Sequence, residues 1–81
     1  MKKIKYFSAE WCGPCKNFKP IIKEIANEGY SVEFIDLDTN PAAASEYGVR
    51  GVPTTIILED DVPVNRFVGA VPKDVILNEI K

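Results

Sequence analysis

The 81-residue sequence contains no histidine and only two cysteines, Cys12 and Cys15. A structural zinc site takes four ligands, most often cysteine and histidine, so one chain cannot supply a complete set of these. The same shortage argues against an iron–sulfur cluster held by four cysteines. Zinc would require carboxylate ligands or a dimer that shares both cysteine pairs, and we expect no bound metal.

The sequence also lacks an excess of charge of one sign. Ten basic and twelve acidic residues give a net charge of −2, and the two signs are interspersed along the chain. A protein that binds DNA or RNA usually carries a basic patch that neutralises phosphates. We therefore expect no nucleic-acid partner.

Long apolar runs are missing as well. No window approaches the roughly eighteen apolar residues that a membrane span needs. The basic start Met1–Lys5 is followed by Tyr6–Glu10, where a signal peptide would need an apolar run. We expect neither a membrane association nor an export signal. Two cysteines in an unexported chain favour a reducing cytoplasm, where a reactive pair is more common than a permanent disulfide.

What is present is the composition of an ordinary folded domain. Apolar residues make up 46% and charged residues 27% of the chain, with no repeat, linker or low-complexity segment. A chain of this length is too short to divide into two cores. Residues 1–81 are expected to form a single domain.

The pattern of apolar and β-branched residues predicts seven elements in the order βαβαββα. Phe18, Ile21, Ile22 and Ile25 recur at helical spacing, and the β-branched run 54–58 is typical of a strand buried on both faces. The strands are predicted at 3–7, 32–37, 54–58 and 64–68, and the helices at 15–28, 41–47 and from Pro72 onward. The α/β fold class that follows is a four-stranded mixed sheet, with a parallel first pair and a C-terminal hairpin, flanked by three helices.

Cys12 and Cys15 lie between the first strand and the first helix, and this placement favours a chemical role. A disulfide that closes so small a loop stabilises a fold little. A thiol at a helix N-terminus lies beside unpaired N–H groups and the positive end of the helix dipole, which stabilise its thiolate. Cys12 has that position and is predicted to attack disulfides, whereas Cys15, one turn further on, is predicted to be more buried.

Four motifs in this order resemble the thioredoxin family and together span most of the chain. They are A-E-W-C-G-P-C-K at 9–16, D-x-N-P at 38–41, Y-G-V-R-G-V-P-T at 47–54 and V-G-A at 68–70. The resemblance implies a thioredoxin-like fold that lacks the N-terminal strand and helix of usual thioredoxins. The strand at 32–37 would then lie at the edge of the sheet.

The resemblance also implies roles for individual residues. Cys12 would be the nucleophile, Cys15 would resolve the mixed disulfide, and Pro53 would follow a cis peptide bond beside them. The positions matching the substrate-binding surface of the family are Trp11, Gly13, Pro14, Val52, Pro53 and Gly69. The backbone of Val52 would pair with an extended substrate.

The implied activity is the reduction of protein disulfides by a thiol–disulfide oxidoreductase that works as a monomer. Its partners would be disulfide-containing proteins and a flavin-dependent thioredoxin reductase that passes on electrons from NADPH. No bound cofactor is needed, because the cysteine pair carries the electrons.

Two positions depart from the family pattern. Usual thioredoxins hold a buried aspartate before the motif and a lysine on the neighbouring strand, and the matching residues here are Tyr6 and Phe34. Neither side chain replaces a carboxylate–ammonium pair at neutral pH. Loss of the Cys15 proton would then depend on water, or on another side chain such as Glu10 or Lys16, and turnover would be reduced.

Two alternatives remain open from the sequence. Glutathione-coupled, glutaredoxin-like activity fits the small size, but Gly13 and Pro14 stand where glutaredoxins usually have Pro-Tyr, and Gly51 replaces their threonine. The other alternative is a non-catalytic subunit that docks a partner on the apolar surface around Trp11, with the thiols incidental. A double cysteine-to-serine variant separates this scaffold role from catalysis.

Overall fold

The computed structural model describes all residues from Met1 to Lys81 and contains the seven elements in the predicted order. The strands are β1 (Lys2–Ser8), β2 (Ser31–Asp36), β3 (Thr54–Glu59) and β4 (Val62–Val68), and the helices are α1 (Gly13–Asn27), α2 (Pro41–Glu46) and α3 (Lys73–Ile80). Several predicted boundaries were wrong by one or two residues. The largest differences are α1, which begins at Gly13 instead of Cys15, and β4, which begins at Val62. No helix has the length and apolar character that crossing a membrane requires.

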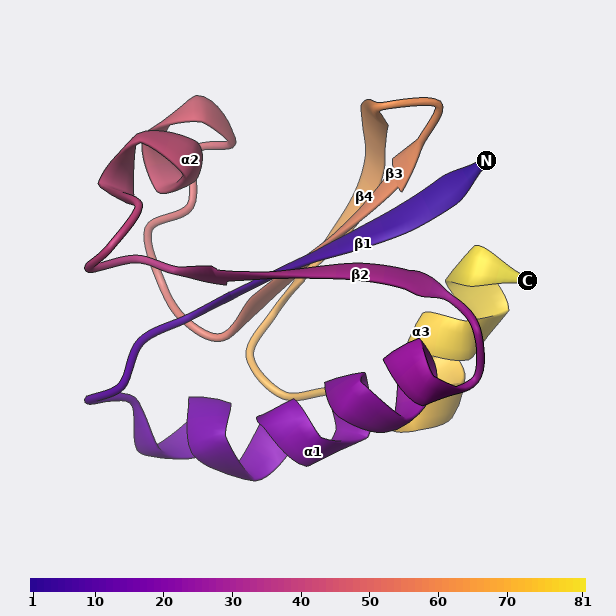
Figure 1. The fold of residues 1–81 in the computed structure, drawn as a ribbon, viewed down its shortest axis with the longest axis horizontal. Coiled ribbons are helices and arrows are strands. Elements are labelled where there is room, and N and C mark those ends of the chain that lie inside the picture. Colours follow the sequence, from indigo (N-terminus) through magenta and orange to yellow (C-terminus); the bar gives the residue numbers. More distant parts are fainter.

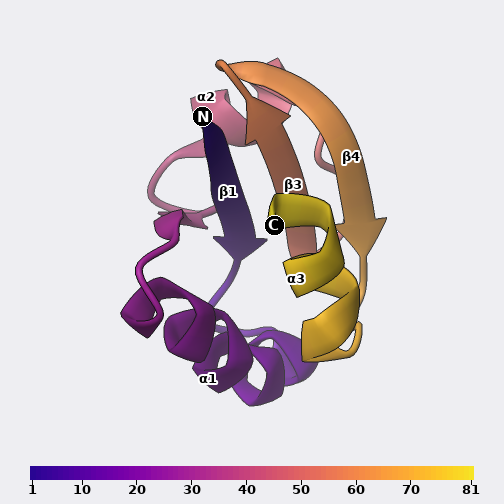
Figure 2. The same cartoon turned by 90° about the vertical axis from the view of Figure 1, so that its right-hand side faces the viewer.

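The four strands form one mixed sheet in the order β2-β1-β3-β4 (Figure 1). β1 and β2 are parallel, whereas β1 with β3 and β3 with β4 are antiparallel. Figure 2 shows β1, β3 and β4 side by side in this order. The predicted mixed sheet is confirmed, and β2 is an edge strand as expected.

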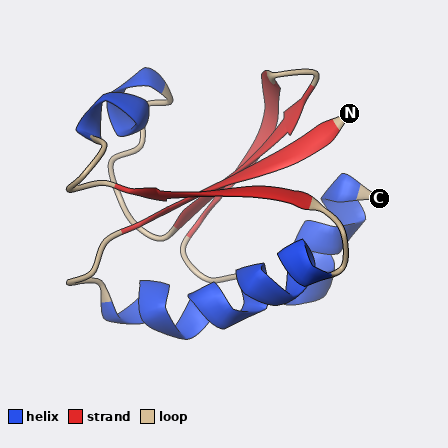
Figure 3. Ribbon diagram, viewed as in Figure 1, coloured by secondary structure: helices blue, strands red, loops and turns tan.

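Helices cover both faces of the sheet (Figure 3). α1 and α3 pack on one face, and the short α2 packs on the other. Successive side chains of a strand point to opposite faces of the sheet, so each strand supplies apolar residues to both cores. On β1, Tyr6 joins the core under α1 and α3, whereas the next residue, Phe7, joins the core under α2. Ile57 and Ile56 divide in the same way on β3.

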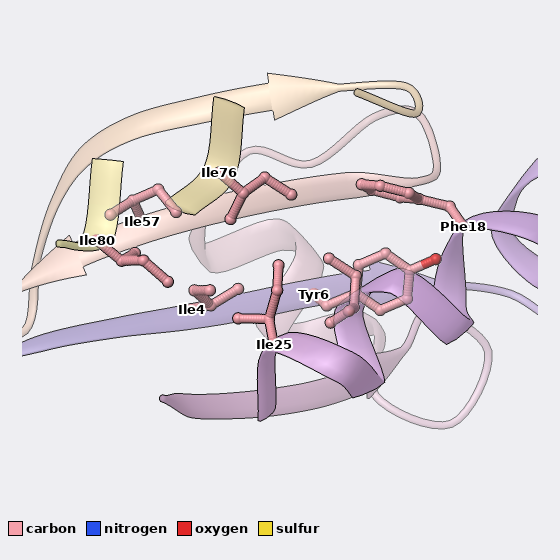
Figure 4. Packing of buried hydrophobic residues seen from close by; sticks show 8 residues of the cluster. Ile4, Tyr6, Phe18, Ile25, Ile57, Ile76 and Ile80 are labelled. Carbon is pink, nitrogen blue, oxygen red and sulfur yellow. The ribbon is translucent and has the colours of Figure 1, made fainter. Parts of the chain in front are cut away.

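The larger core lies between the sheet and the helices α1 and α3 (Figure 4). It consists of eight buried residues: Ile4, Tyr6, Phe18, Ile22, Ile25, Ile57, Ile76 and Ile80. The members from α1 follow the i, i+4, i+7 spacing that the sequence showed, which explains why this stretch forms an amphipathic helix. Burial of this cluster holds α1 against the sheet and so positions the N-terminal end of α1, where Cys12 is the N-cap residue.

The opposite face is covered partly by long polar side chains. The guanidinium group of Arg66 on β4 donates hydrogen bonds to the carbonyl oxygens of Tyr47 and Gly48 behind α2. The ammonium group of Lys5 lies 5.2 Å from the centre of the Tyr47 ring and 3.0 Å from a carboxylate oxygen of Glu33. The aliphatic parts of such side chains shield apolar surface while their charged ends stay in water. The six-residue helix α2 and these side chains together therefore cover the apolar residues of this face.

Candidate active site

Cys12 is the N-cap residue of α1, in the loop that follows β1. Its Sγ accepts the backbone N–H of Cys15 at 3.2 Å, which satisfies one of the free donors at the helix start. Gly13 and Pro14 occupy the first helical positions, where the missing N–H of proline costs no hydrogen bond. Cys12 therefore lies at the N-terminus of a helix, as predicted, and the segment C-G-P-C forms the first turn.

Cys12 and Cys15 form a disulfide, and their Cα atoms are 5.3 Å apart. Both residues are nearly closed to solvent, with 6% of Cys12 and 2% of Cys15 exposed. Cys15 is therefore the more buried of the two, as predicted. Its position is typical of a residue that reacts within the molecule and not with an outside partner.

The loop before β3 approaches the cysteines from a distant part of the chain. The Val52–Pro53 peptide bond is cis, as predicted. Cys12 Sγ lies 3.8 Å from the carbonyl oxygen of Val52, and the N–H of Gly69 donates to the carbonyl of Pro53 at 2.7 Å. Gly69 has φ +90°, a conformation that favours glycine. The structure thus brings the predicted residues from three segments together.

The backbone of Val52 is free on this surface. Neither its N–H nor its carbonyl group takes part in a backbone hydrogen bond. Backbone groups normally find partners, so an unpaired donor and acceptor next to a reactive sulfur are available to another chain.

Trp11 is exposed beside Cys12, with 69% of its surface accessible. Its indole N–H donates to a carboxylate oxygen of Asp38 at 3.1 Å, which holds the ring in place. The D-x-N-P motif at 38–41 assigned no role to Asp38 itself, so this contact was not predicted. The place of Asp38 beyond the carboxyl end of a strand parallel to the first was the available signal, because such ends meet at one edge of a sheet.

Tyr6 lies directly under Cys15 and is fully buried. Its hydroxyl group donates to the carbonyl oxygen of Cys15 at 2.9 Å. Its ring packs edge-on against Phe18, which is drawn beside it in Figure 4, and in the same way against Phe34. Tyr6 and Phe34 are paired in the β1–β2 register. An aromatic pair therefore occupies the positions matched to the family's charged pair, and burial raises the pKa of Tyr6 to about 12.

Alkaline unfolding should report on Tyr6. Its folded pKa, about 12, exceeds the ordinary value of 10.0, so between these pH values the unfolded chain loses a proton that the folded chain keeps. The stabilisation by neutral Tyr6 is complete below pH 10 and is lost as the pH rises through 12. Urea midpoints should therefore fall more steeply above pH 10 for the wild type than for Tyr6→Phe. Equal slopes for the two proteins would contradict this assignment.

Comparison with known proteins identifies the class. Thioredoxin 1 of Synechococcus elongatus is 44% identical over 78 residues, which cover 91% of this chain and 72% of that protein. A bifunctional thioredoxin reductase/thioredoxin of Mycobacterium leprae is 43% identical over 77 residues, covering 91% of this chain and 17% of that protein. Among solved structures, a mutant thioredoxin from Halobacterium salinarum matches with a TM-score of 0.91 and 39% identity, over 98% of this chain and 71% of that one.

The fold, the cysteine pair and these relatives define a thiol–disulfide oxidoreductase. The family model for thioredoxin matches residues 2–81, and the chain belongs to the thioredoxin family.

Proposed function

We propose that the protein reduces disulfides of other proteins by a dithiol mechanism. The thiolate of Cys12 attacks a substrate disulfide and forms a mixed disulfide, and Cys15 then attacks Cys12 and releases the reduced substrate. The observation that carries this proposal is the N-cap position of Cys12, where the N–H of Cys15 points at the sulfur. That donor and the helix dipole both favour negative charge on Cys12.

The substrate binds across the surface formed by Trp11, Gly13, Pro14, Val52, Pro53 and Gly69. The free N–H and carbonyl of Val52 pair with an extended segment of the substrate, as in the addition of a strand. Trp11 offers an exposed apolar ring next to the cysteine, and Gly69 has no side chain to keep the substrate away. This geometry suits a polypeptide beside the disulfide better than a small thiol alone.

The oxidised protein is reduced again by a thioredoxin reductase, which draws electrons from NADPH. The relative from Mycobacterium leprae is named as carrying both activities in one chain, which supports this pairing. The electrons reside on the cysteine pair, so no cofactor is bound. We place the protein in the cytoplasm, where a reductant of this kind is kept reduced, and expect it to work as a monomer.

The reduction potential of the Cys12–Cys15 pair tests the direction of the reaction. The protein is equilibrated with glutathione buffers, and Trp11 fluorescence or thiol alkylation reports the oxidised fraction. A potential near about −270 mV, together with NADPH consumption in the presence of a thioredoxin reductase, supports protein-disulfide reduction. A potential at or above about −200 mV would instead favour glutathione-coupled or oxidising work.

A further inference from the structure

A cavity of about 150 Å³ is lined in part by Cys15. Its charged lining residues come from three segments: Glu10 from the loop, Lys16 and Lys19 from α1, and Asp36 from β2. Ser8, the register partner of Asp36, also borders it. The carboxyl ends of β1 and β2 and the start of α1 lie on the same side of the molecule (Figure 1). The volume is sufficient for water, and the lining supplies the polar partners that water needs.

Asp36 is the carboxylate of this cavity that the fold holds in place. Its Oδ1 accepts the backbone N–H groups of Asp38 at 2.7 Å and of Thr39 at 3.4 Å. Its Oδ2 has no hydrogen-bond partner in the protein. Glu10, in contrast, is exposed and makes neither a hydrogen bond nor an ion pair. The cavity therefore contains one fixed carboxylate with a free oxygen.

Cys15 needs a proton acceptor, because the thiolate and not the thiol attacks a disulfide. The buried Tyr6 donates a hydrogen bond from its hydroxyl group to the Cys15 carbonyl. Burial raises the pKa of Tyr6 to about 12, so the side chain stays neutral far above pH 7. Tyr6 is thus unable to take the Cys15 proton. The charged side chains that share a cavity with Cys15 are therefore the candidates for this role.

We propose that this cavity is the proton path of Cys15 and that Asp36 is its acceptor. The inference rests on the proposed dithiol mechanism. A water molecule takes the proton from Cys15 Sγ and passes one to Asp36. The Cys15 thiolate then attacks the Cys12 sulfur, so that the Cys12–Cys15 bond forms as the bond to the substrate sulfur breaks. The substrate sulfur leaves with the electron pair and takes a proton from solvent, and Asp36 returns its proton to solvent.

Stopped-flow reaction of the reduced protein with excess dithiobis-nitrobenzoate isolates this step. The first phase, whose rate rises with reagent concentration, reports the attack by Cys12. The second phase is intramolecular and independent of concentration, so it reports resolution by Cys15. Absence of a concentration-independent phase in the wild type would refute the dithiol mechanism itself, which distinguishes that failure from a failure of the Asp36 assignment.

Asp36→Asn is the informative variant, because the amide oxygen still accepts both backbone N–H groups while the basic carboxylate is lost. We expect the second phase to slow at least about fivefold at pH 7, the scale of a modest loss of general base catalysis. The two proteins should converge near pH 9.5, where hydroxide deprotonates Cys15, and the first phase should stay within twofold. If Asp36 acted only through its charge, Asp36→Asn would speed the second phase, because removal of a neighbouring negative charge favours the Cys15 thiolate.

Glu10→Gln is the matched control in the same cavity and should leave both phases within twofold. Three outcomes would overturn the proposal. The second phase of Asp36→Asn could keep the wild-type rate, or it could remain slow at pH 9.5. Alternatively, Glu10→Gln and not Asp36→Asn could show the pH-dependent slowing of the second phase.

Discussion

Replacing Cys12 by serine should lower the rate of insulin disulfide reduction by about a thousandfold or more, equivalent to about 4 kcal/mol of activation free energy. A serine hydroxyl at this position remains protonated at neutral pH, so the N–H of Cys15 and the helix dipole have no anion to stabilise. Cys15 should not take over the attack, because it lies inside the first turn of α1 and is the more buried of the two cysteines. The measurement is turnover with a chemical dithiol as the electron source, so that no reductase is required.

Cys15→Ser is the matched variant and should fail at a different step. Cys12 still attacks, but the mixed disulfide is not resolved, and mass spectrometry should detect the protein joined to its substrate. Normal turnover of Cys15→Ser with glutathione would instead indicate the glutaredoxin-like alternative. Full cellular function of the double serine variant would indicate the scaffold role.

Ile57→Ala should lower the free energy of unfolding by about 3 to 4 kcal/mol, within the range of about 2 to 5 kcal/mol for a large aliphatic residue truncated in a packed core. Ile57 is fully buried in the central strand β3, opposite Ile4 and against residues of α1 and α3. Because a small domain has only about 5–15 kcal/mol in total, this variant should lose much of its stability.

Val64→Ala on the neighbouring strand β4 is the control, because 53% of Val64 is exposed. Its free energy of unfolding should change by less than about 0.5 kcal/mol, as for most surface substitutions. Chemical denaturation of both variants at pH 7 provides the comparison. Similar losses for the two would mean that the β3 core is not the main support of the fold.

The sequence alone was sufficient for the order of elements and for the chemistry of the cysteine pair. Hydrophobic spacing is a local property, so the α1 face and the buried β3 strand could be predicted from it. The C-G-P-C segment is also local, since the two cysteines and the helix start between them lie within one turn. Boundaries were less accurate, because the last hydrogen bonds of strands such as β4 depend on the neighbouring strand.

Only the tertiary structure decided what surrounds the cysteines. Asp36 and Asp38 lie more than twenty residues from the cysteines in the sequence, and nothing local indicates that one borders the Cys15 cavity and the other binds the Trp11 indole. They reach the site because β2 runs parallel to β1, so both strands end at the same edge of the sheet. Which residues the parallel pairing places together depends on its register, and packing of the whole core fixes that register.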